Sequence, residues 1–223
     1  MEALIIVDIQ NDFLPGGSLA VPEGDKVIPV INELAGSFKL AVATQDWHPE
    51  NHRSFAVNHP GKNTGDTVSL NGLEQALWPV HCVKGTEGAK LSPKLRRDKI
   101  HRVFQKGTDP YIDSYSGFFD NGRKKSTGLH YFLKSWDVDT VVVVGLAADY
   151  CVKYTALDAL KLGYRTFVVT DATKAVGGPA SFKKTMEELK SKGAFIVNSK
   201  ETLEMIKLEN ERRPERKQAL ESI

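Results

Sequence analysis

A single cysteine stands where a buried strand is expected to give way to a helix. The stretch Val141–Gly163 runs from four valines through a glycine and small residues to Cys151. Small apolar residues then recur at helical spacing, which predicts a helix over Val152–Leu162. A thiol in the first turn of a helix lies near the positive end of the helix dipole, which favours the reactive thiolate. Cys151 is therefore a candidate nucleophile, although a lone cysteine beside a strand is more often a core residue.

Two ionisable side chains at other strand ends could complete such a site. Asp8 lies near the end of the apolar run ALIIVDI, and Lys106 ends the run HRVFQK. Each alone has an ordinary interpretation, Asp8 as a turn cap and Lys106 as a strand-end side chain that reaches solvent. Together with Cys151 they supply a base for the thiol proton and a cation for developing charge, which are the parts of an activated nucleophile.

A second group of residues has the types found in metal sites. Asp46 and His48 form a D-x-H pair, and His81 follows in WPVHC. One carboxylate and two imidazoles suit a divalent ion, most simply Zn²⁺, with Fe²⁺ and Mn²⁺ as alternatives. Three protein ligands leave coordination positions open for water or substrate, as catalytic zinc sites do. The D-x-H pair alone is a weak signal, and His52 is more simply interpreted as a loop histidine than as a further ligand.

Mostly continuous apolar runs predict the strands that would position these side chains. They indicate strands over Ala3–Ile9, Lys39–Thr44, His101–Lys106, Thr140–Gly145, Arg165–Thr170 and Ala194–Asn198. Helical periodicity lies between them, over Val27–Phe38, Gly128–Trp136, Val152–Leu162 and Ser181–Lys190. Such runs are typical of a parallel sheet covered on both faces. We therefore expect an α/β fold, a doubly wound three-layer sandwich with a mostly parallel six-stranded sheet of Rossmann-like type.

The same fold predicts where the site lies. Ligands of such sheets bind beyond the carboxyl ends of the strands. Asp8, Asp46 with His48, Lys106 and the turn Ala147–Cys151 all fall at expected strand ends. We therefore expect the candidate nucleophile and the candidate metal ligands at one edge of the sheet.

Two segments depart from this regular pattern. Residues 47–95 show little periodicity but contain four of the six histidines, and a long irregular insertion usually serves a site or is disordered. Residues 209–223 are highly charged and are expected to form a charged helix or tail, to which we assign no chemistry. The stretch GLAAD is not a G-x-G-x-x-G loop, which argues against nucleotide binding.

Composition sets the remaining limits. The 223 residues are 41% hydrophobic, which indicates one domain over 1–223. Thirty basic residues against 28 acidic ones give a net charge of +2, so the charge does not favour nucleic acid or an anionic membrane as partner. Two cysteines, no signal-peptide pattern and no apolar run near 20 residues favour a reducing, cytoplasmic location and a small-molecule partner.

Five stretches carry a family resemblance. They are VDIQNDF, TQDWHPENHRSF, LNGLEQALWPVHCVKGTEGA, FQKGTDPYIDSYSGF and VVVVGLAADYCVKYTALDALKLGY. In order and context they resemble the nicotinamidases, also called pyrazinamidases, of the isochorismatase-like cysteine hydrolases, over about residues 3–198. The resemblance implies an isochorismatase-type fold and hydrolysis of nicotinamide to nicotinate and ammonia in NAD salvage, and deamidation of pyrazinamide as well. It leaves open whether the chain forms a homo-oligomer.

The resemblance also implies roles for individual residues. Asp8, Lys106 and Cys151 resemble the catalytic triad, and Asp46, His48 and His81 resemble the metal ligands. The N–H groups of Ala147 and Cys151 would form an oxyanion hole, with a cis peptide bond between Leu146 and Ala147. Phe13 and Trp78 resemble the aromatic residues that flank the pyridine ring. One departure is visible, since the family often has threonine where this chain has Ala148.

Other functions fit parts of the pattern. Isochorismatases resemble the chain in fold but lack the metal pair, and carbamoyl amidases share the triad. In a metal or thiol sensor, Cys151 would be oxidised and the metal would be structural. A metal-dependent phosphoesterase is less well supported, because no second carboxylate-rich site is evident. The metal residues and Trp78 favour nicotinamide, and ammonia release from nicotinamide would separate these functions.

Overall fold

Six parallel strands form the central sheet of this computed structural model, which describes residues 1–221, with side chains through residue 211. The strands are β1 (Glu2–Val7), β2 (Ala41–Asp46), β5 (Arg102–Lys106), β6 (Thr140–Leu146), β7 (Arg165–Lys174) and β8 (Phe195–Val197). Their order is β5-β2-β1-β6-β7-β8, and every pairing is parallel. From β1 the sheet grows outward through β2 to β5, and from β6 it grows the opposite way through β7 to β8. A crevice is therefore expected above the carboxyl ends of β1 and β6, where the two halves meet.

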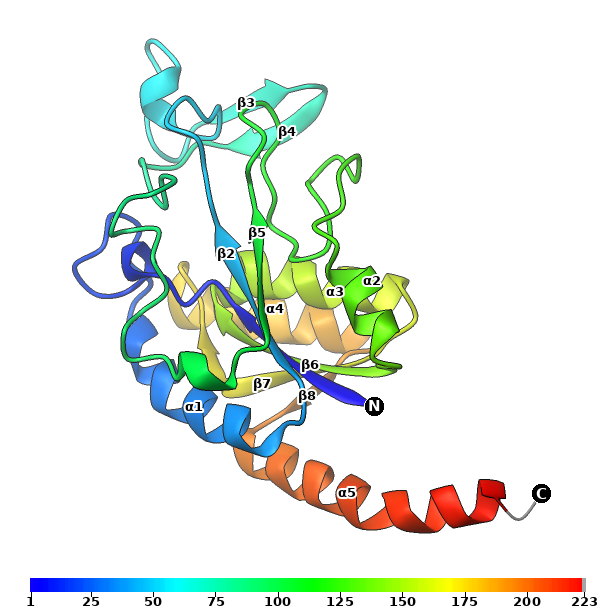
Figure 1. Cartoon of the computed structure of the whole chain (residues 1–223). Coiled ribbons are helices and arrows are strands. Elements are labelled where there is room, and N and C mark those ends of the chain that lie inside the picture. Colours follow the sequence, from blue (N-terminus) through cyan, green and yellow to red (C-terminus); the bar gives the residue numbers. More distant parts are fainter. Residues whose placement is uncertain (222–223) are drawn as a thin grey trace.

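Helices cover both faces of this sheet (Figure 1). Helices α1 (Val27–Ser37) and α5 (Ser199–Glu221) lie on one face, and α2 (Leu129–Ser135), α3 (Lys153–Lys161) and α4 (Gly178–Ser191) lie on the other. Two apolar cores result, because successive side chains of a strand point to opposite faces. In β1, Leu4 and Ile6 belong to the core under α1, whereas Ala3, Ile5 and Val7 belong to the core under α3.

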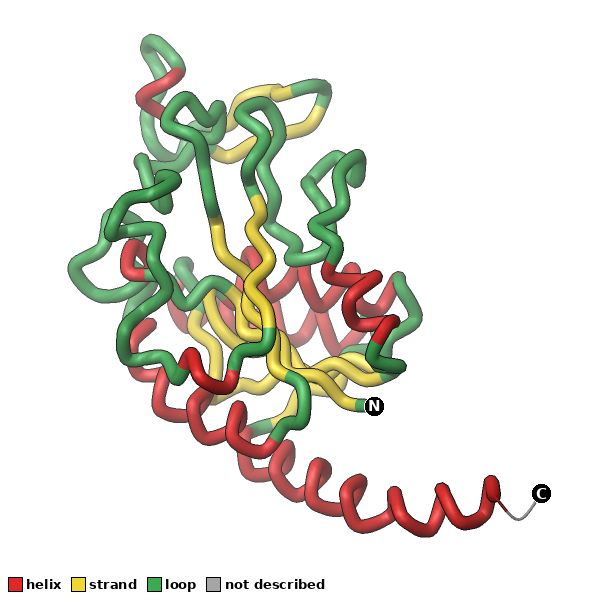
Figure 2. Tube along the Cα trace, in the orientation of Figure 1, coloured by secondary structure: helices red, strands yellow, loops and turns green. Residues whose placement is uncertain are grey.

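Long loops gather beyond the carboxyl ends of β1, β2 and β5 (Figure 2). They include an antiparallel hairpin of β3 (Thr67–Leu70) and β4 (Leu73–Ala76), which forms a separate two-stranded sheet. These loops enclose the edge of the sheet where the candidate site residues were expected. None of the helices within residues 1–221 is both long and apolar enough to cross a bilayer.

The predicted fold class is confirmed, with three local differences. The hairpin β3–β4 was not predicted, because its exposed faces and short strands give no apolar run. Strand β7 continues to Lys174, beyond the predicted end at Thr170, and α5 begins at Ser199, before the charged segment. The single domain over 1–223 and its charged helix or tail over 209–223 stay predictions, and residues 222–223 lie outside the described residues.

Candidate active site

Three residues predicted from strand ends meet above the crevice between β1 and β6. Asp8 directly follows β1, Lys106 ends β5, and Cys151 lies in the turn that leaves β6. Their side chains are almost completely buried. The parallel strands deliver all three because their carboxyl ends share one edge of the sheet.

Lys106 is the centre of this cluster. Its Nζ lies 2.9 Å from Asp8 Oδ2, 3.4 Å from Cys151 Sγ and 2.5 Å from Asp46 Oδ1. It also donates a hydrogen bond of 2.9 Å to the carbonyl oxygen of Ser114. Thr44 fixes the other oxygen of Asp8, since its hydroxyl donates to Oδ1 at 2.6 Å. A carboxylate, a cation and a thiol are thus held in direct contact.

Burial, offset by neighbouring charges, sets the protonation of these groups. It raises the pKa of Asp8 to about 6, against the opposing effect of Lys106. Burial alone would lower the pKa of Lys106, but the carboxylates of Asp46 and Asp8 outweigh it, so the amine stays a cation. Near neutral pH, Asp8 is therefore available as a carboxylate base.

The thiol of Cys151 is harder to deprotonate than an ordinary cysteine thiol. Burial raises the pKa of Cys151 well above the usual value, more than Lys106 lowers it. Desolvation of the buried anion therefore outweighs the favourable effect on the thiolate that the sequence indicated for the start of a helix. Cys151 rests as a thiol, and it needs the neighbouring base to become a nucleophile.

The turn that carries Cys151 is a single π-helical turn, Ala148–Val152, and α3 starts one residue later. The sequence predicted the start of a helix here without distinguishing α from π hydrogen bonds. Single π-turns within helices are often found at functional sites. A cis peptide bond joins Leu146 to Ala147, as the family resemblance implied. Ala148 is fully buried and has no hydroxyl to donate.

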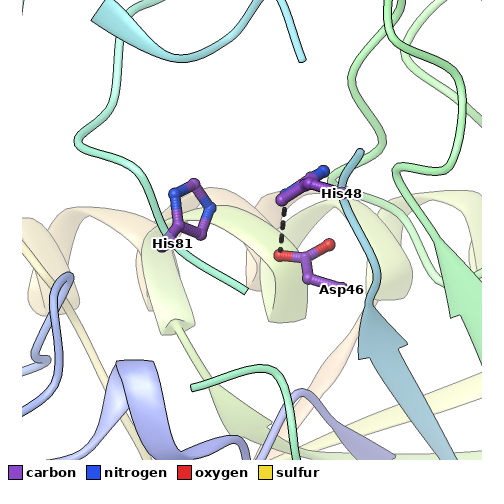
Figure 3. Close-up of side chains that lie close together, drawn as sticks. All are labelled: Asp46, His48 and His81. Atoms are coloured by element: carbon purple, nitrogen blue, oxygen red, sulfur yellow. Dashed lines mark ion pairs between the residues drawn. The ribbon is translucent and has the colours of Figure 1, made fainter. Parts of the chain in front are cut away.

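Asp46, His48 and His81 form a second cluster beside the first (Figure 3). Asp46 and His48 come from the end of β2 and its following loop, and His81 comes from the loop facing them. One ligand atom from each residue lies within 4.8 Å of the others, and all three residues are buried. Asp46 connects the clusters, because Oδ1 contacts Lys106 and Oδ2 lies 3.7 Å from His48 Nε2.

The two imidazoles are oriented as metal ligands usually are. His48 Nδ1 lies 2.8 Å from the carbonyl oxygen of Gly107, and His81 Nδ1 lies 2.8 Å from that of Pro79. Such contacts fix the tautomer with the proton on Nδ1 and leave each Nε2 free to bind an ion. Burial, and then His48, lowers the pKa of His81 to about 4, so its ring is neutral. These donors fit a divalent metal ion.

His52 lies closer to this cluster than its interpretation as a loop histidine suggests. It is fully buried, and its ring centre lies 4.3 Å from that of His48. Its Nδ1 contacts the Ser54 hydroxyl at 2.7 Å, while its buried Nε2 has no hydrogen-bond partner within the described residues. With His48 and Asp113 it forms another group whose ligand atoms lie within 4.8 Å of one another.

A pocket opens onto both clusters. It is lined by Phe13, Leu19, Asp46, Trp78, His81, Asp113, Tyr115, Ala147, Tyr150, Cys151 and Val176. Trp78 stands against Tyr150 at 4.8 Å between ring centres and donates from Nε1 to the Tyr115 hydroxyl at 3.1 Å. Phe13 lies 5.7 Å from His81 by the same measure. The pocket therefore places aromatic rings, metal donors and the thiol around one small volume.

The structure brings together every site residue that the sequence singled out. Sequence reasoning missed Thr44, Asp113, Tyr115 and Tyr150. Period-2 alternation could have found Thr44, because it shares a strand face with Asp46. Asp113 and Tyr115 lie in the irregular segment after Lys106, where no spacing rule separates a site residue from a turn residue.

Known proteins share this arrangement of the chain. A profile of the isochorismatase domain matches residues 2–201. The nicotinamidase of Acinetobacter baylyi is 46% identical over 201 residues, which cover 90% of this chain and 94% of that one. A solved nicotinamidase and pyrazinamidase of Acinetobacter baumanii has a TM-score of 0.87 and 45% identity over 90% of this chain and 97% of its own. The pyrazinamidase of Pyrococcus horikoshii in complex with zinc has a TM-score of 0.73 and 42% identity, over 88% and 98%.

Proposed function

The chain belongs to the isochorismatase family, and we propose that it is a nicotinamidase, which hydrolyses nicotinamide to nicotinate and ammonia. The observation that carries this proposal is the contact of Lys106 with both Cys151 and Asp8, beside a pocket lined by aromatic rings. The product nicotinate is a precursor for NAD, so the reaction belongs to NAD salvage. Pyrazinamide has the same carboxamide on a similar six-membered ring, and it is a second substrate.

Acylation begins with a proton transfer. Asp8 takes the thiol proton of Cys151, and the sulfur then attacks the carboxamide carbon of the substrate. Lys106 contacts both residues, so its cation stabilises the carboxylate before the transfer and the thiolate during it. Asp8, now protonated, returns the proton to the amine, and ammonia leaves as the tetrahedral intermediate collapses to a thioester.

The developing oxyanion needs donors that are already in place. We assign this role to the N–H group of Ala147, which belongs to the cis peptide bond before the π-turn, and to that of Cys151 within the turn. Each such donor is worth about 3 kcal/mol of transition-state stabilisation in enzymes of this kind. Water then hydrolyses the thioester, with Asp8 as base once more, and nicotinate leaves.

The ligands Asp46, His48 and His81 would hold one divalent ion, and zinc is our assignment because the P. horikoshii relative binds it. When bound, the ion supplies a Lewis acid for the ring nitrogen of the substrate and for water. The chain itself supplies the rest of the substrate site. Phe13 and Trp78 line the same pocket as the thiol, and they are assigned to contact the pyridine ring.

The partner of this enzyme is a small molecule, nicotinamide. We place the enzyme in the cytoplasm, where a reducing environment keeps thiols such as Cys151 free. The homo-oligomeric state stays a prediction.

Ammonia release from nicotinamide tests the proposal directly. The zinc-loaded protein should release ammonia and nicotinate in equal amounts, and pyrazinamide should react as well. An unreactive zinc-loaded protein, or a protein that instead hydrolyses N-carbamoyl amino acids, would contradict the proposal. A sensor would bind metal and release no ammonia.

A further inference from the structure

We propose that Gln10 and Asp12, which follow the base Asp8 in the sequence, are positioning residues that fix the two metal-binding segments relative to each other. Gln10 fixes the end of β2, which carries Asp46, and Asp12 fixes the loop that carries His81. The inference rests on the proposed function, because it takes Asp46 and His81 as metal ligands.

The side chain of Gln10 forms hydrogen bonds with both the N–H and the carbonyl group of Asp46. Its Nε2 donates to the carbonyl oxygen of Asp46 at 2.8 Å, and its Oε1 accepts from the N–H of Asp46 at 2.7 Å. The same Nε2 also donates to the carbonyl oxygen of Ala89 at 2.9 Å. Gln10 is fully buried, so these bonds have no competition from water. The side chain therefore sets the position of the peptide units that carry the metal ligand.

Asp12 fixes the backbone of Cys82, the residue after His81. Its Oδ2 accepts a hydrogen bond of 2.7 Å from the N–H of Cys82. Cys82 has a φ of 47°, in the left-handed region that non-glycine residues seldom adopt, so this bond is made at a strained position of the backbone. A Cβ at Gly88 would lie 2.1 Å from Asp12 Oδ2, so the loop passes directly against the carboxylate. Asp12 thus holds the His81–Cys82 turn.

The segment that carries these two side chains is itself fixed to the loop after His81. The N–H groups of Asn11 and Asp12 donate to the carbonyl oxygens of Lys90 and Gly88, both at 3.0 Å. The base Asp8 begins this same segment. A displacement of the segment would therefore move the base and both metal-binding segments together. Gln10 and Asp12 thus affect the metal site through the backbone, without contact with the ion.

Zinc affinity, measured by competition with a chromophoric chelator, tests the inference without using turnover. Gln10→Met keeps the side-chain length and removes the hydrogen bonds, and Asp12→Ala removes the acceptor. Both should raise the dissociation constant for zinc by about 10- to 100-fold, the usual effect of residues that orient metal ligands. Asp12→Asn keeps an oxygen for the Cys82 N–H and should recover most of the affinity. For nicotinamide, KM should rise by a larger factor than kcat falls.

Two controls separate the possible failures. Thr166→Val removes a buried hydrogen bond to the carbonyl oxygen of Tyr164 at the amino end of β7, far from the site, and should leave zinc affinity unchanged. Asp46→Ala should abolish tight zinc binding.

If Asp46→Ala loses zinc while Gln10→Met and Asp12→Ala bind it as wild type does, the positioning role is wrong and the proposed function stands. If Asp46→Ala still binds zinc tightly, the metal assignment fails and the positioning role fails with it. Should Gln10→Met not fold, the comparison of Asp12→Ala with Asp12→Asn decides, and equal affinities of these two would overturn the role of Asp12.

Discussion

Cys151 and Cys82 are both buried thiols, yet their surroundings differ. Cys151 Sγ lies 3.4 Å from Lys106 Nζ and faces the pocket, whereas Cys82 packs in the apolar core under α1. Burial raises the pKa of both thiols well above the usual value. Reactivity at this site therefore comes from a neighbouring base and cation, and not from a preformed thiolate.

Replacing each cysteine by alanine should separate these roles. Cys151→Ala should lower kcat by at least about 10⁴-fold, as loss of a nucleophile does in hydrolases, because no other group can form the thioester. Cys82→Ala should keep most of the turnover and lose some thermal stability through the cavity it leaves. Steady-state ammonia release and circular dichroism measure both effects. Similar losses of turnover in two well-folded variants would contradict the assignment of Cys151.

Residue types at strand ends were enough to predict Asp8, Lys106, Cys151, Asp46 and His48 as neighbours, whereas His81, in the irregular segment, was added by its residue type and by the family resemblance. The side chains that orient them were not predicted. Gln10 and Asp12 act through backbone groups of residues that are distant in the sequence, and any turn-forming segment offers similar residues. A hydrogen bond to a main-chain atom leaves no pattern of residue types, so only the folded structure identifies it.

Among the secondary-structure elements, β5 is followed by a residue that packs directly against the candidate metal ligand His48. Gly107 follows β5 with a φ of 62°, and its carbonyl oxygen contacts His48 Nδ1. A Cβ built on Gly107 would lie 2.3 Å from His48 Cε1 and 2.6 Å from Nδ1. No side chain fits there, so a glycine at the strand end is what allows the imidazole to take its position.

Gly107→Ala should therefore displace His48 and weaken zinc binding by about tenfold or more. The matched control is Gly163→Ala, since Gly163 has a φ of 85° but an added Cβ would meet no heavy atom within 4 Å. The control should cost about 1 kcal/mol in stability from its left-handed backbone and leave zinc affinity unchanged. Chelator competition and thermal melting measure both. Equal zinc affinities in the two variants would show that His48 does not need this close approach.

Element prediction worked best where the apolar runs were long. Strands β1 and β6 are buried on both faces, so their continuous runs of apolar residues identified them within two residues at each end. The π-turn at Ala148–Val152 was missed, because helical periodicity looks the same whether the first turn has α or π hydrogen bonds. The hairpin β3–β4 was missed because its strands lie half-exposed over the site and do not form part of a core.

The molecule as a whole places its two clusters at one point of a doubly wound sheet. Strand order brings β1 beside both β2 and β6, so residues from positions 8, 46, 106 and 151 converge although they are far apart in the sequence. The prediction of a parallel sheet already implied one shared edge. The order of the strands, and with it the contact of Lys106 with both carboxylates, could not be predicted from periodicity alone.

Zinc should stabilise the folded chain, because its ligands come together only in the native state. At a free zinc concentration 100 times the dissociation constant, the gain in unfolding free energy should be about 2.7 kcal/mol. For a chain of 223 residues this corresponds to a rise in Tm of several degrees, about 5–10 °C. Differential scanning calorimetry with and without zinc measures the shift. A shift of equal size in Asp46→Ala would contradict a site built on that carboxylate.

In this mechanism Cys151 attacks a pyridine carboxamide, and an aldehyde provides the decisive test of that attack. Pyridine-3-carbaldehyde accepts a thiol to form a tetrahedral adduct but has no amine to expel, so the reaction should stop at a mimic of the intermediate, and such mimics bind more tightly than substrates. We expect reversible, competitive inhibition and a crystal structure with the adduct on Cys151 Sγ. Benzaldehyde, which lacks the ring nitrogen, should inhibit far more weakly in zinc-loaded protein. An adduct on any other residue, or inhibition without an adduct on Cys151, would contradict the covalent mechanism.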